Sequence, residues 1–145
     1  MSPCSTVSEA YAAHRVGERM RDGTIFAGIS PDTGKAIYTT GSDAIHTHDW
    51  FEAKAYCEAS EKSPDAVNSS GHKEWRVPTK GELNVLFQNR AAIGGFNESG
   101  SYPAGWYWSS SHYDDPYGNA WAQRFSDGLQ LYNYDNGASY LRCVR

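Results

Sequence analysis

The residues of this sequence that are best suited to catalysis or metal binding are few and scattered. His46-Thr47-His48, directly before Asp49, comes closest to a metal cluster, since a His-x-His pair on a strand points both rings to one side. A zinc site needs three or four ligands, and the sequence places no third one nearby. We therefore interpret His46 to Asp49 as a polar loop that leads into a helix cap, and we predict no bound metal or cofactor.

Three other groups of reactive residue types lack the spacing that their chemistry requires. Asp114-Asp115 is not surrounded by the alternating ligands and fixed glycine of a calcium loop, which favours a solvated turn. Ser109 to Ser111 shows no Gly-x-Ser-x-Gly elbow. Gly94-Gly95 is not followed by the Lys and Ser or Thr of a phosphate loop. We accordingly expect a protein that is not an enzyme.

The three cysteines, Cys4, Cys57 and Cys143, form no Cys-x-x-Cys pair, which argues against structural zinc. A nucleophilic cysteine needs a nearby histidine and an electropositive setting. Cys57 and Cys143 instead fall on the apolar faces of a predicted helix and a predicted strand. Buried unreactive thiols and one mutual disulfide both fit this pattern.

The C-terminal third carries a different chemistry, that of a binding surface. Seven of the ten tyrosines lie between Tyr102 and Tyr140, and Arg124 is the only Lys or Arg across that stretch. Tyrosine supplies a large rigid contact area, and serine and asparagine adapt their hydrogen bonds, as in antibody paratopes. Strand alternation predicts an outward, ligand-binding set that consists of His112, Tyr113, Asp114, Asp115, Tyr117, Asn119, Gln130, Tyr132, Tyr134, Asn136, Ser139 and Tyr140. The alternative is that these tyrosines form cross-strand pairs that merely stabilise a thin sheet.

Periodicity and turn signals predict an α+β domain with two helices and a mainly antiparallel sheet. One helix is expected over residues 49–62, and a second begins after Thr79, whose capping box with Glu82 marks its start. A weak helix or linker is expected over residues 1–21. Strands are expected over residues 24–29, 35–40, 74–79, 105–111, 119–125, around 129–134, and 139–145.

The last four of these strands are expected to form a meander. Asn136-Gly137, the strongest short hairpin signal, should join the final two strands. Alternation predicts an inward scaffold set that consists of Trp108, Trp121, Phe125, Leu129, Leu131 and Val144.

Size and charge exclude several classes of function. The chain has 145 residues, which suits one domain, and a net charge of -4 with no basic cluster, so nucleic-acid binding is not expected. No apolar run approaches the length of a membrane span, and the N-terminus shows no secretory signal. We expect the protein to reach an outside surface, if it does so, through a phage particle or a carrier protein.

Several motifs in order resemble C-type-lectin-fold domains of the Lcl-C-terminal-like kind. The resemblance covers residues 22–145. It is carried by Asp22 to Ile29, Asp49 to Cys57, Trp75 to Leu83, Trp106 to Ser111, Ala120 to Phe125, Asp127-Gly128 and Leu141 to Arg145.

The resemblance implies a C-type lectin-like fold and a function in binding a protein or glycan ligand. Some members of this fold are the variable proteins of diversity-generating retroelements, in which a reverse transcriptase rewrites adenines in the C-terminal coding region. Asparagine codons can thereby become codons for Tyr, Asp, Ser or His. The expectation is a phage adhesin or bacterial surface binder with a variable region at about residues 106–145.

The resemblance also implies a disulfide between Cys57 and Cys143, worth at most about 4.5 kcal/mol by the chain-entropy estimate. The Glu-Pro-Asn and Trp-Asn-Asp motifs of calcium-dependent lectins are absent, so calcium-dependent sugar binding is not expected. An undiversified lectin-like binding module is the alternative. An enzyme akin to formylglycine-generating oxidases is disfavoured, because no reactive cysteine pair is placed for it.

Overall fold

The computed structural model describes residues 14–60, 75–114 and 118–145, which form an α+β domain. Within these residues there are two antiparallel sheets and three helices. The elements are β1 (Ile25–Ile29), β2 (Ala36–Thr39), α2 (Trp50–Ser60), α3 (Lys80–Gln88), α4 (Arg90–Ile93), β3 (Trp106–His112), β4 (Asn119–Arg124) and β5 (Gln130–Tyr134).

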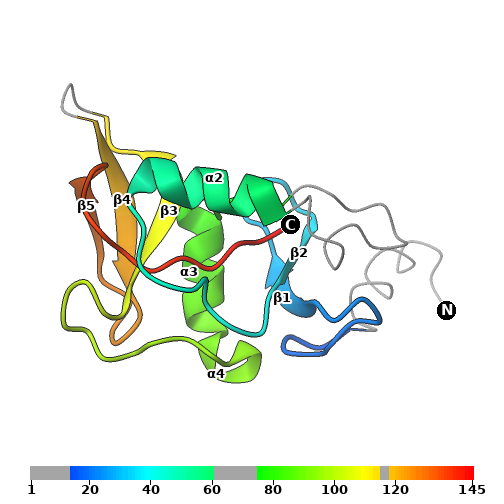
Figure 1. The fold of residues 1–145 in the computed structure, drawn as a ribbon. Coiled ribbons are helices and arrows are strands. Elements are labelled where there is room, and N and C mark those ends of the chain that lie inside the picture. Colours follow the sequence, from blue (N-terminus) through cyan, green and yellow to red (C-terminus); the bar gives the residue numbers. More distant parts are fainter. Residues whose placement is uncertain (1–13, 61–74, 115–117) are drawn as a thin grey trace, which may run out of the picture.

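Helix α3 lies between the two sheets (Figure 1). It contacts β1 on one side and β3 and β4 on the other, while α2 packs across β3. The two sheets, with strand orders β1-β2 and β3-β4-β5, therefore share α3 as a common support, and β5 is the strand farthest from β1 and β2 (Figure 1).

The predicted hairpin and helix starts are confirmed, because local hydrogen bonds determine them. β1 and β2 pair antiparallel, as the turn residues between them indicate. At α2, the backbone N–H of Glu52 donates to Asp49 Oδ1, and the N–H of Asp49 donates to Glu52 Oε1. Thr79 and Glu82 form the same reciprocal cap at α3.

The predicted N-terminal helix is wrong for residues 14–21, which are not helical; residues 1–13 of that prediction lie outside the described residues. Gly17 has a positive φ of 93°, and its N–H donates to the carbonyl of Phe26. The N–H of Phe26 in turn donates to the carbonyl of Glu18. Bonds to β1 therefore replace the hydrogen bonds that a helix would have made.

The predicted meander is right for three strands and wrong for the fourth. β4 lies between β3 and β5, but residues 139–145 do not pair with β5. They cross instead to β3, where Tyr140 pairs with Tyr107 in parallel, and end with Val144 bridged to both Thr39 and Arg76. The Asn-Gly signal marks a turn here but no hairpin, because the final segment pairs with β2, β3, His48 and Arg76 instead of β5.

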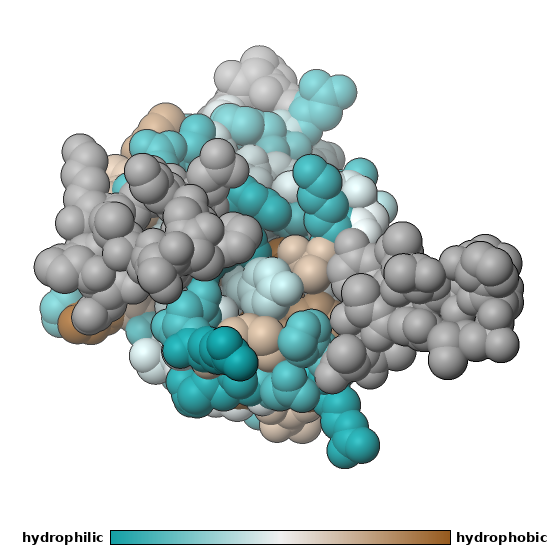
Figure 2. Space-filling view, turned by 90° about the vertical axis from the view of Figure 1, so that its right-hand side faces the viewer, coloured by the Kyte–Doolittle hydropathy of each residue, from teal (hydrophilic) through white to brown (hydrophobic). Residues whose placement is uncertain are grey.

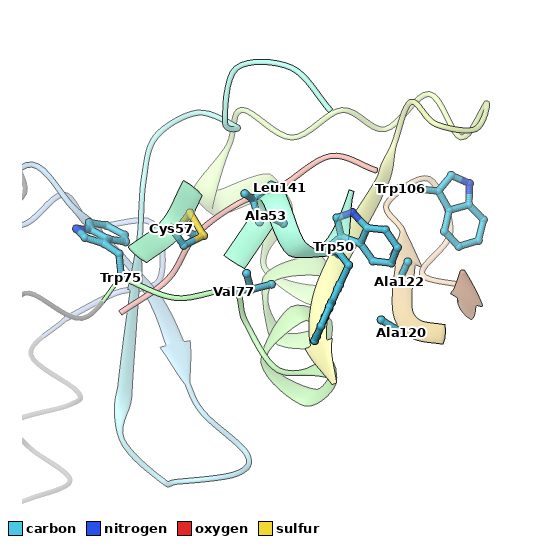
Figure 3. Packing of buried hydrophobic residues seen from close by; sticks show 11 residues of the cluster. Trp50, Ala53, Cys57, Trp75, Val77, Trp106, Ala120, Ala122 and Leu141 are labelled. Atoms are coloured by element: carbon cyan, nitrogen blue, oxygen red, sulfur yellow. A yellow bond between two sulfur atoms is a disulfide. The ribbon is translucent and has the colours of Figure 1, made fainter. Parts of the chain in front are cut away.

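The core forms two clusters, one between α2 and the C-terminal sheet and one around α3. The first includes Trp50, Trp108 and Leu141, and the disulfide between Cys57 and Cys143 lies in it, with a Cα–Cα distance of 5.7 Å (Figure 3). The implied cysteine pairing is therefore formed. It joins α2 to the C-terminal segment across 86 positions of sequence.

The inward scaffold set is only partly right. Trp108, Phe125 and Val144 are buried, but Leu129 and Leu131 are 41% and 45% exposed. The two leucines lie at or next to the outermost strand, where none of the three described helices packs against their side of the sheet. Alternation predicts correctly that Leu131 lies on the same face as the buried Ala122. At β5, however, the described residues do not bury that face.

At the opposite end of the molecule, on the side of β1 and β2, the part of the surface that is coloured in Figure 2 is mainly hydrophilic, with a small apolar area near the centre of the view. In the described parts of the chain, no helix has the length and apolar character to cross a membrane.

Candidate ligand-binding surface

Three aromatic side chains gather on the α3 side of the C-terminal sheet, and we call Tyr113, Trp121 and Tyr132 the aromatic face. Trp121 on β4 lies directly opposite Tyr132 on β5. Tyr113, just after β3, stacks on Tyr132 with a ring-centroid distance of 4.4 Å and meets Trp121 edge-on at 5.3 Å. Trp121, predicted inward, therefore shares a face with Tyr132, predicted outward, and is only half-buried.

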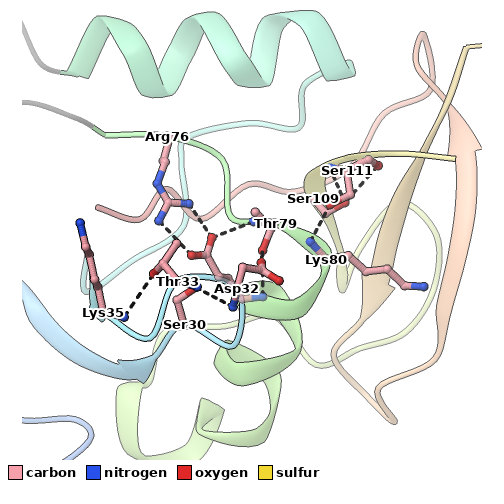
Figure 4. A network of polar contacts seen from close by, with 10 residues as sticks. Ser30, Asp32, Thr33, Lys35, Arg76, Thr79, Lys80, Ser109 and Ser111 are labelled. Atoms are coloured by element: carbon pink, nitrogen blue, oxygen red, sulfur yellow. Dashed lines mark hydrogen bonds and ion pairs between the residues drawn. The ribbon is translucent and has the colours of Figure 1, made fainter.

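Lys80, the first residue of α3, touches all three strands beneath this face. Its backbone N–H donates to Ser111 Oγ at 2.9 Å, and its carbonyl accepts from Gln130 Nε2 at 3.3 Å. Its Nζ lies 3.5 Å from the centroid of the Trp121 ring, a cation–π contact. Figure 4 shows how Lys80 approaches Ser111 at the start of α3. Sequence reasoning missed Lys80, because nothing local links a helix start to a strand far along the chain.

The strand β5 carries the most exposed aromatic residues of the predicted set. Tyr132 is 51% exposed and Tyr134 is 63% exposed, and Gln130 on the same face is half-buried. Asp114 and Asn136, in the turns beside them, are exposed. Three of these predicted residues, Gln130, Tyr132 and Tyr134, therefore share one face of β5.

Other members of the predicted set lie elsewhere. His112 is exposed, but on the opposite face, where its ring packs edge-on against Trp50 at 4.3 Å. Asp115 and Tyr117 lie outside the described residues. The predicted set is therefore spread over two faces of the sheet rather than one.

Besides the half-buried Tyr113 and Gln130, three more predicted outward residues are buried or half-buried, which corrects the alternation-based assignment. Asn119 is 3% exposed, because it begins the central strand, and Ser139 is fully buried where it pairs with His48. Tyr140 is half-buried against Tyr107, and its hydroxyl accepts from Asn97 Nδ2 at 3.3 Å. The final segment enters the core, so its alternation does not report exposure to solvent.

A buried charge network fixes that final segment. The Arg142 side chain is fully buried; its Nε donates to Asp43 Oδ1 at 3.0 Å and its Nη1 donates to the carbonyl of Thr40 at 2.8 Å. The hydroxyl of Tyr107 donates to the second oxygen of Asp43. Burial raises the pKa of Asp43 against the opposing effects of Tyr107 and Arg142, and burial lowers the pKa of Arg142. These groups satisfy one another, and we interpret the network as structural.

A second network holds the β1–β2 turn against the start of α3 (Figure 4). Arg76 donates to both carboxylate oxygens of Glu82, one of them at 2.9 Å, and the hydroxyl of Thr79 donates to Asp32. Burial raises the pKa of Glu82, but hydrogen bonds from Arg76, the Thr79 backbone and Ser30 outweigh it and lower the pKa to about 2. Glu82 is therefore a buried anion that fixes the position of α3.

The residues that the sequence offers for metal or redox chemistry include His48, Asp49, Cys57 and Cys143, and these four make structural contacts. Among the described residues, no group of three or more His, Cys, Asp or Glu side chains could hold a metal ion. The Nε2 atom of His48 lies 3.1 Å from the carbonyl of Ile45, and Asp49 caps α2 as predicted. Cys57 and Cys143 are joined to each other and are at most 5% exposed.

Comparison with protein families matches residues 18–145 to the model of the Lcl C-terminal domain. The chain belongs to the Lcl C-terminal domain family. The match includes both sheets, α3 and the whole aromatic face, so the surface described above lies within the Lcl C-terminal domain itself. No curated protein matches the chain.

Proposed function

We propose that this Lcl C-terminal domain is a non-enzymatic ligand- or receptor-binding domain whose C-terminal surface is diversified by a diversity-generating retroelement. Such a domain would serve as a phage adhesin or a bacterial surface binder. We further propose that its fold is C-type lectin-like, which the disulfide between α2 and the final segment supports.

The observation that carries the proposal is the separation of two kinds of residue within residues 106–145. Trp108, Phe125 and Leu141 are fully buried, whereas Tyr132 and Tyr134 are more than half exposed. A buried position tolerates little change without loss of stability, while an exposed one tolerates most substitutions. A rigid core beside a tyrosine-rich surface is the arrangement that a diversified binder requires.

The aromatic face adds support from its geometry. Tyr113 and Tyr132 stack on each other, and Lys80, which lies outside residues 106–145, supports Trp121 from below. Binding surfaces gain affinity when their aromatic residues are held in place before the ligand arrives. A fixed residue under a variable surface would preserve its shape as other side chains change.

The decisive experiment is to sequence the DNA beside the gene. We expect a near-copy of the C-terminal coding region, next to a reverse-transcriptase gene, that differs only where the copy has adenine. The differing codons should fall on exposed residues such as Tyr132 and Tyr134, and not on Trp108 or Phe125. Without a near-copy, or with differences spread equally over buried residues, diversification is wrong and an undiversified lectin-like binding module is the better description.

A further inference from the structure

The outer edge of β5 is the open edge of the C-terminal sheet. At the other edge, the final segment covers β3, because the N–H of Trp108 donates to the carbonyl of Tyr140 and the N–H of Tyr140 donates to that of Trp106. Within the described residues no strand pairs with the outer side of β5 (Figure 1). In the part of the chain that the structure describes, the sheet therefore ends in a strand with one side unpaired.

Three hydrogen bonds identify which backbone groups of β5 point outward. The N–H of Arg124 donates to the carbonyl of Leu129, so this pair is of the hydrogen-bonded type. Bonded and non-bonded pairs alternate along an antiparallel ladder. The register of β4 with β5 then makes Leu131 and Asn133 bond to β4 and turns the backbone groups of Gln130 and Tyr132 outward.

Two further bonds agree with this assignment. The carbonyl of Trp121, opposite Tyr132, accepts from Ser109 Oγ on β3 and so points away from β5. The N–H of Tyr134 is bonded to the side-chain oxygen of Asn133 rather than to β4. The outward donors of β5 that remain are therefore the N–H groups of Gln130 and Tyr132.

The features by which sheet edges usually avoid other strands are missing from β5. Edge strands are commonly protected by lysine, proline or a bulge. The sequence Gln130-Leu-Tyr-Asn-Tyr134 contains no charged residue and no proline, and its register with β4 is regular. Leu131 and Tyr132, exposed on opposite faces, flank this open edge with apolar surface.

We propose that β5 binds an extended segment of a protein ligand as an additional antiparallel strand of this sheet. The partner segment should be uncharged over most of its length and carry a lysine or arginine at its N-terminal end. Antiparallel pairing puts that end beside Asp135, which directly follows β5. The Asp135 carboxylate leans toward Gly118, just before β4, so the partner needs the long side chain of a lysine or arginine to reach it across the face of β5.

This inference rests on the proposed function and gives its ligand a chemical class. Backbone hydrogen bonds supply affinity in strand addition, and side chains on either face supply specificity. Bonds from Gln130 and Tyr132 do not depend on which side chains those positions carry. A diversified β5 would therefore keep a constant part of its affinity while its specificity changes.

The test uses the full chain, labelled with ¹⁵N, and a short synthetic peptide of alternating threonine and valine with an N-terminal lysine. On addition of the peptide, the amide signals of Gln130 and Tyr132 should shift and their exchange with solvent should slow. Those of Leu131 and Asn133, already bonded to β4, should change least. Replacing the lysine of the peptide by glutamate should weaken binding about two- to fivefold.

A matched pair of variants isolates the backbone contribution. Tyr132→Pro removes the ring and the outward N–H, whereas Tyr132→Thr removes only the ring. We expect the proline variant to bind the peptide about three- to tenfold more weakly than the threonine variant. Should the proline variant fail to fold, the amide shifts of the unaltered chain still decide the question.

Several results would overturn the proposal. One is that Gln130 and Tyr132 amides do not respond at about 1 mM peptide. Equal binding by the two folded variants is another. A dimer in sedimentation that Tyr132→Pro abolishes would assign the edge to a second copy of the chain instead. None of these results bears on the near-copy in the DNA, so the two proposals fail separately.

Discussion

Strands β3 and β5 belong to the same sheet and are both rich in aromatic residues, yet they have opposite environments. In β3, Trp106, Tyr107 and Trp108 are at most 9% exposed. In β5, Leu131, Tyr132 and Tyr134 are 45% to 63% exposed. The comparison teaches that position in the sheet, rather than residue type, decides which aromatic residues form core and which form surface.

The difference has a direct structural cause. α2 covers one face of β3, α3 covers the other, and the final segment covers its edge. β5 has β4 on one side, and the start of α3 reaches it through the Gln130–Lys80 hydrogen bond. Each prediction below tests whether β3 is the fixed part of the molecule and β5 the part that is free to vary.

The largest effect is expected from truncating equivalent aromatic residues in the two strands. Trp108→Ala should lower the free energy of unfolding by about 3–5 kcal/mol, because it leaves a cavity between α2 and the sheet. Tyr134→Ala should change it by no more than about 0.5 kcal/mol. Urea unfolding measures both, and comparable losses in the two variants would remove the distinction between the strands.

Loss of the disulfide should come next and should act on β3 rather than β5. The double variant Cys57→Ala with Cys143→Ala is expected to lose about 2–4 kcal/mol. Hydrogen exchange should become faster for the amides of Trp108 and Tyr140, which pair the final segment with β3. Amides of Leu131 and Asn133 should respond less, and equal acceleration in both strands would contradict this localisation.

Two carboxylates with the same low pKa should differ in their contribution to stability. Glu82 is buried in the first turn of α3, whereas Asp127 is exposed in the turn before β5. The pKa of each carboxylate is about 2. A pKa below the ordinary value stabilises the folded state above the unfolded pKa of 4.5, and this stabilisation is lost as the pH falls toward 2. For Glu82 the loss should be about 2 kcal/mol, allowing for solvent around the half-exposed Arg76.

The control is Glu82→Gln, which should be less stable than the unaltered chain near neutral pH and should converge with it as the pH falls toward about 2. Salt at about 1 M should weaken the Arg124–Asp127 pair, which is exposed, and leave the Arg76–Glu82 pair largely intact. Unfolding curves over pH and salt measure both effects. A salt sensitivity of the Glu82 contribution equal to that of Asp127 would show that Glu82 is not protected from solvent.

The smallest effect is expected at Lys80, where α3 meets the aromatic face. Lys80→Met keeps the aliphatic chain but removes the charge over Trp121, and should cost about 0.5–1 kcal/mol. Lys80→Arg keeps the charge and should therefore retain most of that stability. In fluorotryptophan NMR, the Trp121 resonance should shift in the methionine variant and not in the arginine variant. If methionine and arginine behave alike, the charge does not support the aromatic face.

How much of this could be predicted from sequence depends on the range of the interactions involved. The caps at Asp49 and Thr79 and the turn around Ser30 depend on neighbours within a few positions, and all three are confirmed. The pairing of Cys57 with Cys143 came from the family resemblance, because residue types alone left free thiols possible.

The errors arise where distant segments decide burial. Alternation gives the two faces of a strand but not what covers them, so Leu131 was assigned to the core and Asn119 to the surface. Gly17 and Ser139 form bonds with residues of β1 and with His48 that no local pattern indicates. Within the candidate surface, Tyr132 and Tyr134 were predicted correctly as exposed, whereas Lys80 could not be found without the fold.

The final segment has a consequence for how the chain is made. Residues 139–145 join β2, β3 and the strand-like residue Arg76, and Arg142 fills a buried charge site against Asp43. The core cannot be completed before these residues have been synthesised, because Arg142 and Val144 are fully buried in it. A stop codon or frameshift anywhere in residues 106–138 removes this closing piece, and the cell's proteases would clear the product. Only versions of the surface that keep residues 139–145 would therefore accumulate.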